Sequence, residues 1–309
     1  MYSLSDLREG INNPARIVGE LRKYSYKFNS AVHSLSPKEG LHVMDEDWDN
    51  LIILDAARYD IFEEITDFNE ELLKQKSLGS SSIEFITENF VGNEHHDTVY
   101  VTANPYYELL GDNVFHDVIP LMDEWDNQSQ TVLPEDVVSA AIKTNSNYPN
   151  KRLIVHFMQP HIPFIGSKGR RINTDGWNPG AENDEQMISC WTTLMYGYRH
   201  DFSESDVREA YVENHKIAIE HASKLQNNLT GKTVITADHA NLIGERMSPI
   251  PARAYGHFVG LREPPLIEVP WQPLTYDKRK QIESEPPTSE IETMNQEERN
   301  MRLEALGYK

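Results

Sequence analysis

The stretch that decides the fold is Trp48-Asp49-Asn50-Leu51-Ile52-Ile53-Leu54-Asp55, in which a run of large apolar residues ends at a carboxylate. A strand with one solvated face would alternate apolar and polar residues, whereas a continuous apolar run is typical of a strand buried on both faces. Strands of that kind occur in parallel sheets that are covered by helices. We therefore predict that this segment is a central strand of an α/β domain.

Similar apolar segments recur along the chain and alternate with segments of helical periodicity. The other expected strands are residues 97–102, 152–158, 232–238 and 266–271. The expected helices are residues 61–74, 82–89, 134–145 and 205–228. This alternation predicts a largely parallel central sheet with helices on both faces. Ligands bind at the carboxyl ends of the strands in such sheets, so the residues that follow each strand are the first candidates for a site.

The overall composition limits the kinds of partner. Of 309 residues, 49 are acidic and 29 are Lys or Arg, which gives a net charge of −20. This charge disfavours nucleic acid as a partner, because phosphate backbones attract basic surfaces. The acidic, lysine-poor composition also resembles that of halophilic proteins from salt-rich cytoplasms, where screening weakens self-repulsion. Cys190 is the only cysteine, so neither an intramolecular disulfide nor a cysteine-based metal cluster is expected.

The two ends of the chain differ from the middle. Residues 1–47 are expected to form a polar helical arm, whose helix over 15–28 carries the basic residues Arg16, Arg22, Lys23 and Lys27. Such an arm can contact an anionic surface, including the periphery of a membrane, although a solvated helix face is the commoner explanation. Residues 276–309 are rich in glutamate and predict a peripheral helix or a flexible extension. The main α/β domain is expected to span residues 48–275.

The sequence also bears on location. No run of 18 residues is apolar enough to predict a transmembrane helix. The first 20 residues lack the apolar core of a secretory signal. The expected location is therefore the cytoplasm.

Carboxylates stand where two of the predicted strands end. Asp55 ends the first strand, and the adjacent Asp238 and His239 stand at the end of the strand over 232–238. A carboxylate at a strand end is a natural ligand for a hard cation, and a carboxylate next to an imidazole matches zinc or manganese. An aspartate in such a place can instead cap the next helix, so Asp55 alone predicts little. The Asp238–His239 pair is more informative.

Histidines from two further segments add to this group. His161 lies between two prolines just after the strand over 152–158, and the prolines fix the backbone that holds it. We expect His161 to bind a metal, whereas His156 alternates with the apolar residues of the strand and is expected to be a hydrogen-bonded core histidine. His257 lies in a proline-rich loop, 18 residues after His239. Alone it would be an ordinary loop histidine.

A nucleophile is expected in the segment Ser77-Leu78-Gly79-Ser80-Ser81-Ser82-Ile83-Glu84-Phe85, where three serines precede a short helix. The simplest explanation is that Ser81 or Ser82 caps the helix. A hydroxyl in this position also lies in the positive field of the helix N-terminus, which helps it to ionise and to bind an anion. Ser82 starts the expected helix and ranks first, and Ser80 is the alternative.

These motifs, in this order, resemble the alkaline phosphatase superfamily and in particular its sulfatase-like branch. The shared pattern is an aspartate after the first strand, a hydroxyl or thiol nucleophile at the start of a helix, a Pro-His-x-Pro stretch, an Asp-His pair and a later Gly-His. The pattern spans about residues 48–271. It is similar to the catalytic domains of lipoteichoic acid synthases and phosphoethanolamine transferases, and to short sulfatase-like proteins of halophilic archaea.

The resemblance implies an alkaline-phosphatase-like fold and one or two divalent metal ions. Zinc ranks ahead of manganese, magnesium and calcium. The residues that would bind metal are Asp55, Asp238, His239, His161 and His257. The first three, with the oxygen of the nucleophile, would hold one ion. The other two would hold a second ion or contact the transferred group.

Departures from the family pattern change the expected chemistry. Sulfatases mature a Cys or Ser that is followed by Pro and Arg, and neither Ser80 nor Ser82 has that context, so phosphate esters rank ahead of sulfate esters. We expect a metal-dependent hydrolase or transferase in which the serine attacks and a covalent intermediate forms. The anionic ester substrate, which the resemblance allows to be glycan-linked, is expected to contact Arg58 and Asn104. Arg58 can instead pair with Asp60.

Two other functions fit the same residues. One is a non-catalytic α/β protein that binds a glycan or a protein partner and keeps a vestigial metal site. The other is a phosphomutase. Metal content, turnover of a phosphodiester and an aryl sulfate, and an isomerisation assay would separate these from the hydrolase or transferase.

Overall fold

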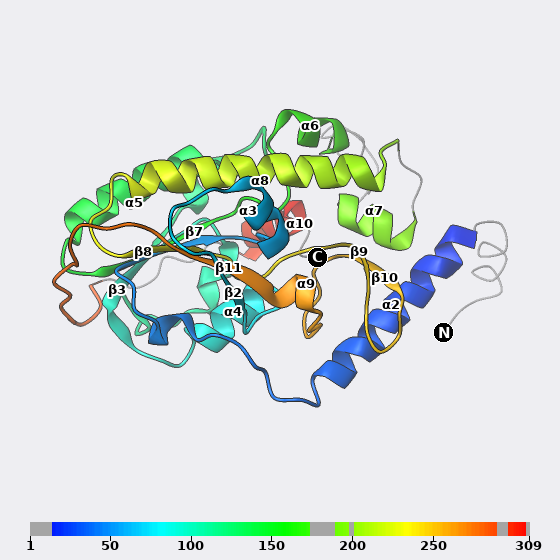
Figure 1. Ribbon diagram of the computed structural model, residues 1–309, viewed down its shortest axis with the longest axis horizontal. Coiled ribbons are helices and arrows are strands. Elements are labelled where there is room, and N and C mark those ends of the chain that lie inside the picture. The colour runs from blue at the N-terminus through cyan, green and yellow to red at the C-terminus, as the bar shows by residue number, and fades with distance from the viewer. Residues whose placement is uncertain (1–13, 174–188, 198–200, 289–295, 307–309) are drawn as a thin grey trace.

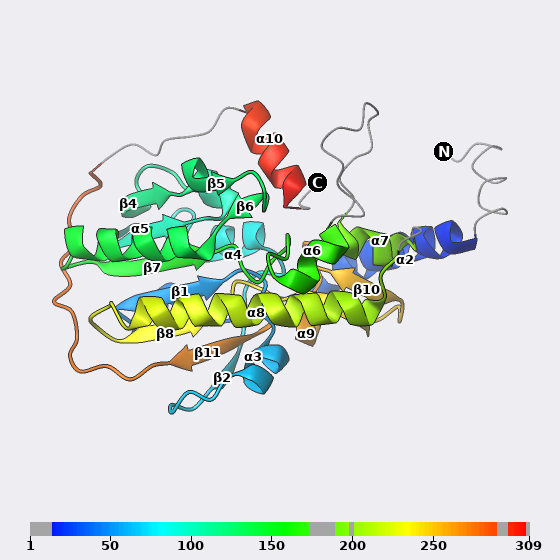
Figure 2. The ribbon, with the colours of Figure 1, turned by 90° about the horizontal axis from the view of Figure 1, so that it is seen from above.

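A sheet of seven strands, in the order β2-β11-β8-β1-β7-β3-β4, forms the centre of the protein. The computed structural model describes residues 14–173, 189–197, 201–288 and 296–306. The strands of the sheet are β1 (Asn50–Leu54), β2 (Leu73–Lys76), β3 (His95–Thr102), β4 (Phe115–Pro120), β7 (Arg152–Phe157), β8 (Thr233–Thr236) and β11 (Glu268–Pro273). β8, β1, β7, β3 and β4 run parallel, while β11 runs antiparallel to both of its neighbours, β8 and β2. The predicted largely parallel sheet is confirmed, with β1 in the middle (Figure 2).

Helices cover both faces of this sheet, as predicted. Figure 1 shows α5 and α8 over one face and α4 on the other. The helices are α2 (Pro14–His33), α3 (Tyr59–Ile65), α4 (Ser82–Asn89), α5 (Pro134–Asn147), α6 (Ser167–Asn173), α7 (Cys190–Tyr196), α8 (Glu204–Gln226), α9 (Pro264–Ile267) and α10 (Gln296–Ala305). Short 3-10 turns occur at η1 (Val43–Asp45), η2 (Pro105–Leu109) and η3 (Met122–Glu124). Two small hairpins pair β9 (Leu242–Arg246) with β10 (Arg253–Gly256) and β5 (Trp125–Asp126) with β6 (Thr131–Val132).

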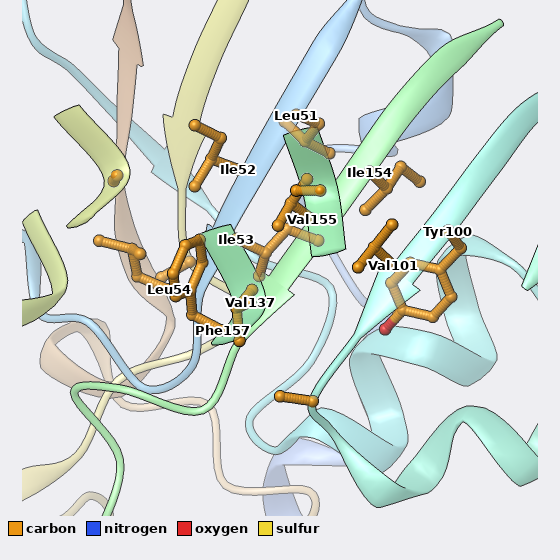
Figure 3. Packing of buried hydrophobic residues seen from close by; sticks show 14 of the residues in the cluster. Leu51, Ile52, Ile53, Leu54, Tyr100, Val101, Val137, Ile154, Val155 and Phe157 are labelled. Atoms are coloured by element: carbon orange, nitrogen blue, oxygen red, sulfur yellow. The ribbon is translucent and has the colours of Figure 1, made fainter. Parts of the chain in front are cut away.

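The apolar run of β1 lies in the middle of the hydrophobic core. All four residues 51–54 are 0% exposed, and the run lies next to Ile154 and Val155 of β7 (Figure 3). Burying each of these side chains contributes about 1.5–3 kcal/mol relative to leaving it in water. Because helices cover both faces of the sheet, neither face of β1 needs polar residues. This explains why the run does not alternate.

Two elements differ from the prediction. The helix expected over 61–74 is shorter, because α3 ends at Ile65 and the chain returns as the edge strand β2, which pairs with β11. Asp67 and Asn69 follow the end of α3, and both residue types favour turns over helix interiors. The strand expected over 266–271 begins as the short helix α9, with Pro264 in its first turn, and β11 starts only at Glu268.

Both ends of the chain pack on the main domain where they are described. α2 is longer than the predicted 15–28 and contacts α7 and β10. Arg279 pairs with Asp49 just before β1 at 2.7 Å, and Leu306, just after α10, is fully buried in the core. Residues 1–13, 289–295 and 307–309 of the predicted arm and extension lie outside the described residues, and the division at 47 and 275 stays a prediction. Among the described helices, none is both long and apolar enough to span a bilayer.

Candidate metal centre

Two carboxylates meet at the carboxyl ends of neighbouring strands. Asp55 directly follows β1 and Asp238 follows β8 by two residues, so the parallel pairing of these strands brings both to one edge of the sheet. Both side chains are fully buried. The backbone N–H of Ala56 donates to Asp238 Oδ1 at 3.0 Å, and Ala56 has a left-handed backbone with φ of 62°. Such strain at a residue other than glycine is typical of sites that the surrounding structure holds in place.

The first residue of α4 points its hydroxyl at these carboxylates. Ser82 Oγ lies 2.6 Å from Asp238 Oδ2 and 3.2 Å from Asp55 Oδ2. It also lies 3.4 Å from Nε2 of His239. A single hydroxyl proton can bond only one of the two carboxylates. Two buried negative charges therefore converge on one oxygen, an arrangement that a cation would stabilise.

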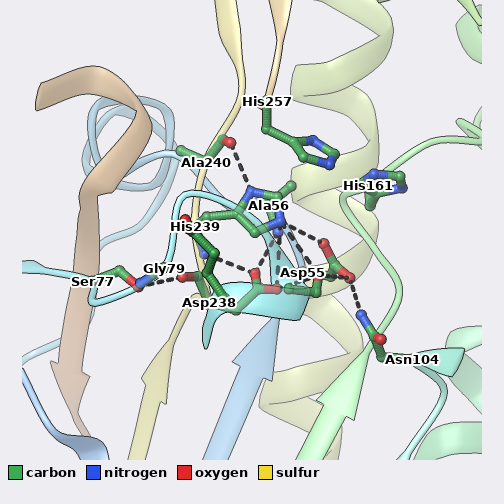
Figure 4. A network of polar contacts seen from close by, with 12 residues as sticks. Asp55, Ala56, Ser77, Gly79, Asn104, His161, Asp238, His239, Ala240 and His257 are labelled. Atoms are coloured by element: carbon green, nitrogen blue, oxygen red, sulfur yellow. Dashed lines mark hydrogen bonds and ion pairs between the residues drawn. The ribbon is translucent and has the colours of Figure 1, made fainter. Parts of the chain in front are cut away.

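His239 completes the group with its ring nitrogen Nε2. Its Nδ1 lies 2.8 Å from the carbonyl of Ala240, so an N–H at Nδ1 donates there and the lone pair is on Nε2 (Figure 4). That nitrogen is 3.6 Å from Asp55 Oδ1 and 3.5 Å from Asp238 Oδ2. The ring thus directs Nε2 at both carboxylates.

The spacing of these four donors fits a tetrahedral ion. Ligand atoms at the usual distance from zinc stand about 3.3 Å from one another. The separations that involve Ser82 Oγ or His239 Nε2 run from 2.6 to 3.6 Å, with Asp55 presenting Oδ2 to the serine and Oδ1 to the histidine. Within the described parts of the chain, Asp55, Asp238 and His239 form a possible metal-binding group with ligand atoms no more than 4.8 Å apart. One nitrogen with several oxygens is a donor set that zinc and manganese accept.

His161 and His257 lie beside this group (Figure 4). The ring centroid of His257 is 4.4 Å from that of His239 and 5.2 Å from that of His161. Nδ1 of His161 is 2.7 Å from the carbonyl of Ile162, and Nδ1 of His257 is 2.8 Å from Asn241 Oδ1, so each ring carries its lone pair on Nε2. Burial lowers the pKa of His161 to about 4, and burial with repulsion from the neighbouring rings lowers that of His257 well below 6.5. Both rings are neutral at pH 7.

His156 of β7 makes the core hydrogen bond that was predicted, with Nδ1 2.7 Å from the hydroxyl of Tyr100. Its other nitrogen faces the candidate metal centre, which the sequence did not predict. Nε2 lies 3.7 Å from Asp238 Oδ2 and 4.0 Å from Asp55 Oδ2. Burial, partly offset by attraction from Asp238, lowers the pKa of His156 to about 4. This histidine is therefore a neutral ring at pH 7, and it lies next to both carboxylates.

The carboxyl of Asp238 remains ionised in spite of its burial. Burial by itself raises its pKa. Attraction from His239 and His156, with hydrogen bonds from Ser82 and Ala56, outweighs that effect and holds the pKa below the usual 3.8. Asp238 can therefore accept hydrogen bonds and bind a cation at neutral pH.

Ser80 faces away from this group. Its backbone N–H and its hydroxyl donate to Glu84 Oε2 at 2.9 and 2.5 Å, and the hydroxyl also lies 2.9 Å from the carbonyl of Phe258. A Cβ on Gly79 would come within 2.5 Å of the backbone nitrogen of Phe85, so only glycine allows the loop to approach α4 this closely. The structure brings Ser82, and not Ser80, to the carboxylates.

Arg58 is itself buried and pairs with two carboxylates that are partly exposed. Its Nε and Nη2 donate to Asp60 at 2.8 and 2.7 Å, which is the pairing that the sequence left open. Its Nη1 lies 2.8 Å from Glu245 Oε1. The guanidinium thus connects the start of α3 with β9, and both partners are carboxylates of this chain.

Two asparagines orient residues of the site. Asn104, which was expected to contact substrate, donates from Nδ2 to Asp55 Oδ2 at 2.8 Å. Asn241 accepts from Nδ1 of His257, and its backbone carbonyl accepts from Arg58 Nη1 at 2.8 Å. The sequence reasoning missed Asn241, although it stands directly after the Asp-His-Ala segment. Its position there was a signal that could have marked it.

No family model matches the chain, and no curated protein matches it. Several solved structures are similar to it, including the following three. The C-terminal periplasmic domain of EcEptC from Escherichia coli, in complex with zinc, has 12% identity and a TM-score of 0.44 over 74% of this chain and 72% of that chain. A second structure of that domain has 13% identity and a TM-score of 0.41 over the same shares. The integral membrane lipooligosaccharide phosphoethanolamine transferase EptA from Neisseria meningitidis has 13% identity and a TM-score of 0.37, over 72% of this chain and 46% of that chain.

Phosphoethanolamine transferases are among the proteins that the sequence motifs resemble. The similarity between the folds is remote, with identities of 12–13% and TM-scores below 0.5. Any function of this chain must therefore be inferred from the geometry of its own site.

Proposed function

We propose that this protein is a metal-dependent phosphoryl-transfer enzyme that uses Ser82 as its nucleophile on a phosphate ester. The observation that supports the proposal is the position of the Ser82 hydroxyl, which lies within 3.4 Å of two buried carboxylates and the imidazole of His239. A serine that merely capped α4 would bond backbone N–H groups of the helix instead. This constellation joins a hydroxyl, an acceptor for its proton and a cation-binding set at one point.

Two features of the chain itself can help to activate Ser82. Asp238 Oδ2, at 2.6 Å, is placed to accept the hydroxyl proton, and the N-terminal end of α4 favours negative charge on the oxygen. A divalent ion held by Asp55, Asp238 and His239 would further lower the pKa of the hydroxyl and offset charge on the transferred group. His161 and His257, both neutral, would contact that group or its leaving oxygen.

The reaction proceeds in two displacements. The Ser82 oxygen forms a bond to phosphorus while the bond from phosphorus to the leaving alcohol breaks, and the leaving oxygen takes up a proton. Water or an acceptor alcohol then attacks the phosphoserine, the bond to Ser82 breaks, and the serine recovers its proton. Water makes the protein a hydrolase and an alcohol makes it a transferase. A sulfate ester ranks second, because Ser82 lacks the sequence context of sulfatase maturation.

The test combines metal content with turnover. The full chain is refolded with zinc or with manganese, and bound metal is measured by mass spectrometry. It is then assayed on p-nitrophenyl phosphate, bis(p-nitrophenyl) phosphate and p-nitrophenyl sulfate, with acid quench to trap phosphoserine. We expect bound metal, turnover of a phosphate ester and a phosphoryl group on Ser82. Bound metal with no turnover of any ester would favour the glycan- or partner-binding module, and turnover of the sulfate alone would refute phosphoryl transfer.

A further inference from the structure

Helix α2 turns its apolar residues toward solvent. Ile17, Leu21, Tyr24 and Phe28 are 46%, 62%, 55% and 52% exposed. Their spacings of four, three and four residues place them on a single stripe along the helix. A surface helix normally turns such a stripe toward the core. The outer face of α2, defined by these four residues, is therefore an exposed apolar seam.

The opposite face of α2 is fixed to the main domain, where Tyr26 stacks on Phe258 with ring centroids 4.4 Å apart. A Cβ on Gly19 would come within 2.8 Å of the backbone of Tyr196, so the helix backbone packs directly on α7. Arg22 Nη1 donates to a carbonyl of α7 at 2.9 Å. The side chain of Asn29 exchanges two hydrogen bonds with the backbone of Ile250, each of 3.0 Å. The helix cannot roll its seam inward without breaking these contacts.

The spacing of the seam is that of the a and d positions of a coiled coil. Leu21 and Phe28 occupy a, and Ile17 and Tyr24 occupy d. A second α2 that runs antiparallel would place Leu21 against Tyr24 of the second copy and Ile17 against Phe28 of the second copy. Two-fold symmetry makes each of these contacts twice. The spacing of the seam therefore allows it to pack against a second copy of itself.

The charges beside the seam complement one another in the same arrangement. Glu20 and Lys27 both occupy g positions on one flank, while Val18 and Ser25 occupy e positions on the other. When two identical helices pair antiparallel, like flanks meet and g faces g. Glu20 of each copy then comes next to Lys27 of the other. A parallel pair would bring g to e and would lose both ion pairs.

We propose that α2 pairs antiparallel with α2 of a second copy of this chain and so forms a homodimer. An interfacial helix that binds anionic lipid carries Lys and Arg beside its apolar face, whereas this one has Glu20 as well as Lys27 on one flank and uncharged Val18 and Ser25 on the other. Because the main domain holds α2 in place, pairing orders little additional backbone. The seam is short, so we expect a dimer that dissociates on dilution. This proposal does not depend on the chemistry at Ser82.

Sedimentation velocity of the full chain over a range of concentrations tests the dimer. We expect a monomer–dimer equilibrium in the wild type and a monomer at every concentration for Leu21→Glu combined with Phe28→Glu. Both positions are exposed, so circular dichroism and thermal melting should show an unchanged fold. Val91→Glu is the matched control, because Val91 is also an exposed apolar residue, at 38%, but lies outside α2. This variant should dimerise as the wild type does.

A charge swap tests the antiparallel register. Glu20→Lys alone and Lys27→Glu alone should each raise the dissociation constant at least several-fold, because each leaves like charges facing one another. The double variant should restore the wild-type value. A wild type that is monomeric at all concentrations, or a double variant as weak as the single ones, would overturn the proposal. Binding of the monomer to phosphatidylglycerol vesicles, lost in Leu21→Glu, would assign the seam to a lipid surface instead.

Discussion

Ser82 Oγ lies 2.6 Å from Asp238 Oδ2, although 156 positions separate the two residues in the chain. The contact joins the first turn of α4 to the carboxyl end of β8, the two elements whose ends favour an anion and a cation respectively. The hydroxyl is thus polarised by an ionised carboxylate before any substrate arrives. This relationship distinguishes Ser82 from the other serines of its segment.

Exchanging each serine for alanine tests that distinction. Ser82→Ala should lower kcat by about 10³-fold or more and abolish the phosphoserine, because the attacking oxygen is lost. Ser80→Ala should keep kcat and cost about 1 kcal/mol of stability, since it removes the hydroxyl that donates to Glu84. Acid-quench mass spectrometry and urea unfolding measure the two effects. Equal losses of kcat in both variants would contradict the assignment.

Removing one carboxylate tests the metal centre without an activity assay. Protein refolded with zinc should melt at a higher temperature than protein refolded without metal, because the ion binds only the folded state. Asp238→Asn should abolish this difference and most of the bound zinc. Asp117→Asn is the control, since Asp117 is also a hydrogen-bonded aspartate but bonds Tyr148 away from the site. A zinc response that survives Asp238→Asn would argue against this ligand set.

Asn241 is expected to act by positioning His257. Asn241→Ala removes the acceptor for Nδ1 of that ring, and we expect kcat to fall about 10- to 100-fold while bound metal stays unchanged. Asn241→Asp keeps an acceptor oxygen and should recover part of the loss. Steady-state kinetics measure kcat, and metal analysis of the same samples measures bound metal. Full activity of Asn241→Ala would show that the orientation of His257 is unimportant.

His215 makes folding stability depend on pH. Its Nδ1 donates to the carbonyl of Tyr211 and its Nε2 accepts from the N–H of Arg58, so both nitrogens are used by the neutral ring. Burial lowers its pKa from 6.5 to about 3. Between these values the unfolded chain binds a proton that the folded chain does not. His215 therefore lowers the stability by about 1.4 kcal/mol for each unit of pH below 6.5.

Replacement of this histidine checks the sign and size of that effect. The free energy of unfolding in urea, measured at pH 7 and pH 5, should fall less steeply for His215→Gln than for the wild type. An unchanged slope in His215→Gln would mean that the ring is protonated in the folded protein.

The parts of the fold that were predicted correctly depend on local pattern. The apolar run of β1 and the periodicity of α4, α5 and α8 report burial directly, and the rule that ligands gather at strand ends located Asp55 and Asp238. β2 and β4 were missed. β2 is at the edge of the sheet and its residues are mostly exposed, so it lacks the apolar run that marks a central strand.

The roles of several side chains depend on partners that are distant in sequence. The sequence indicates only that His156 is a core residue. The register of β1 against β7 brings its Nε2 within 4.0 Å of Asp55 Oδ2. Arg58 reads as a candidate for an anionic substrate until β9 supplies Glu245. The sequence favoured Ser82 over Ser80 as the nucleophile but could not decide between them. The direction in which each hydroxyl points is set by how the loop packs on α4. Such choices need three-dimensional contacts.

Asp55, Asp238 and His239 are each 0% exposed, so an ion among them has no direct contact with bulk water. Its exchange would require the residues around it to move, so we expect release to be slower than from an exposed site. Brief treatment with a chelator would leave the ion in place, whereas unfolding would free it. The metal found in the purified protein would then be a record of which ion was abundant when the chain folded.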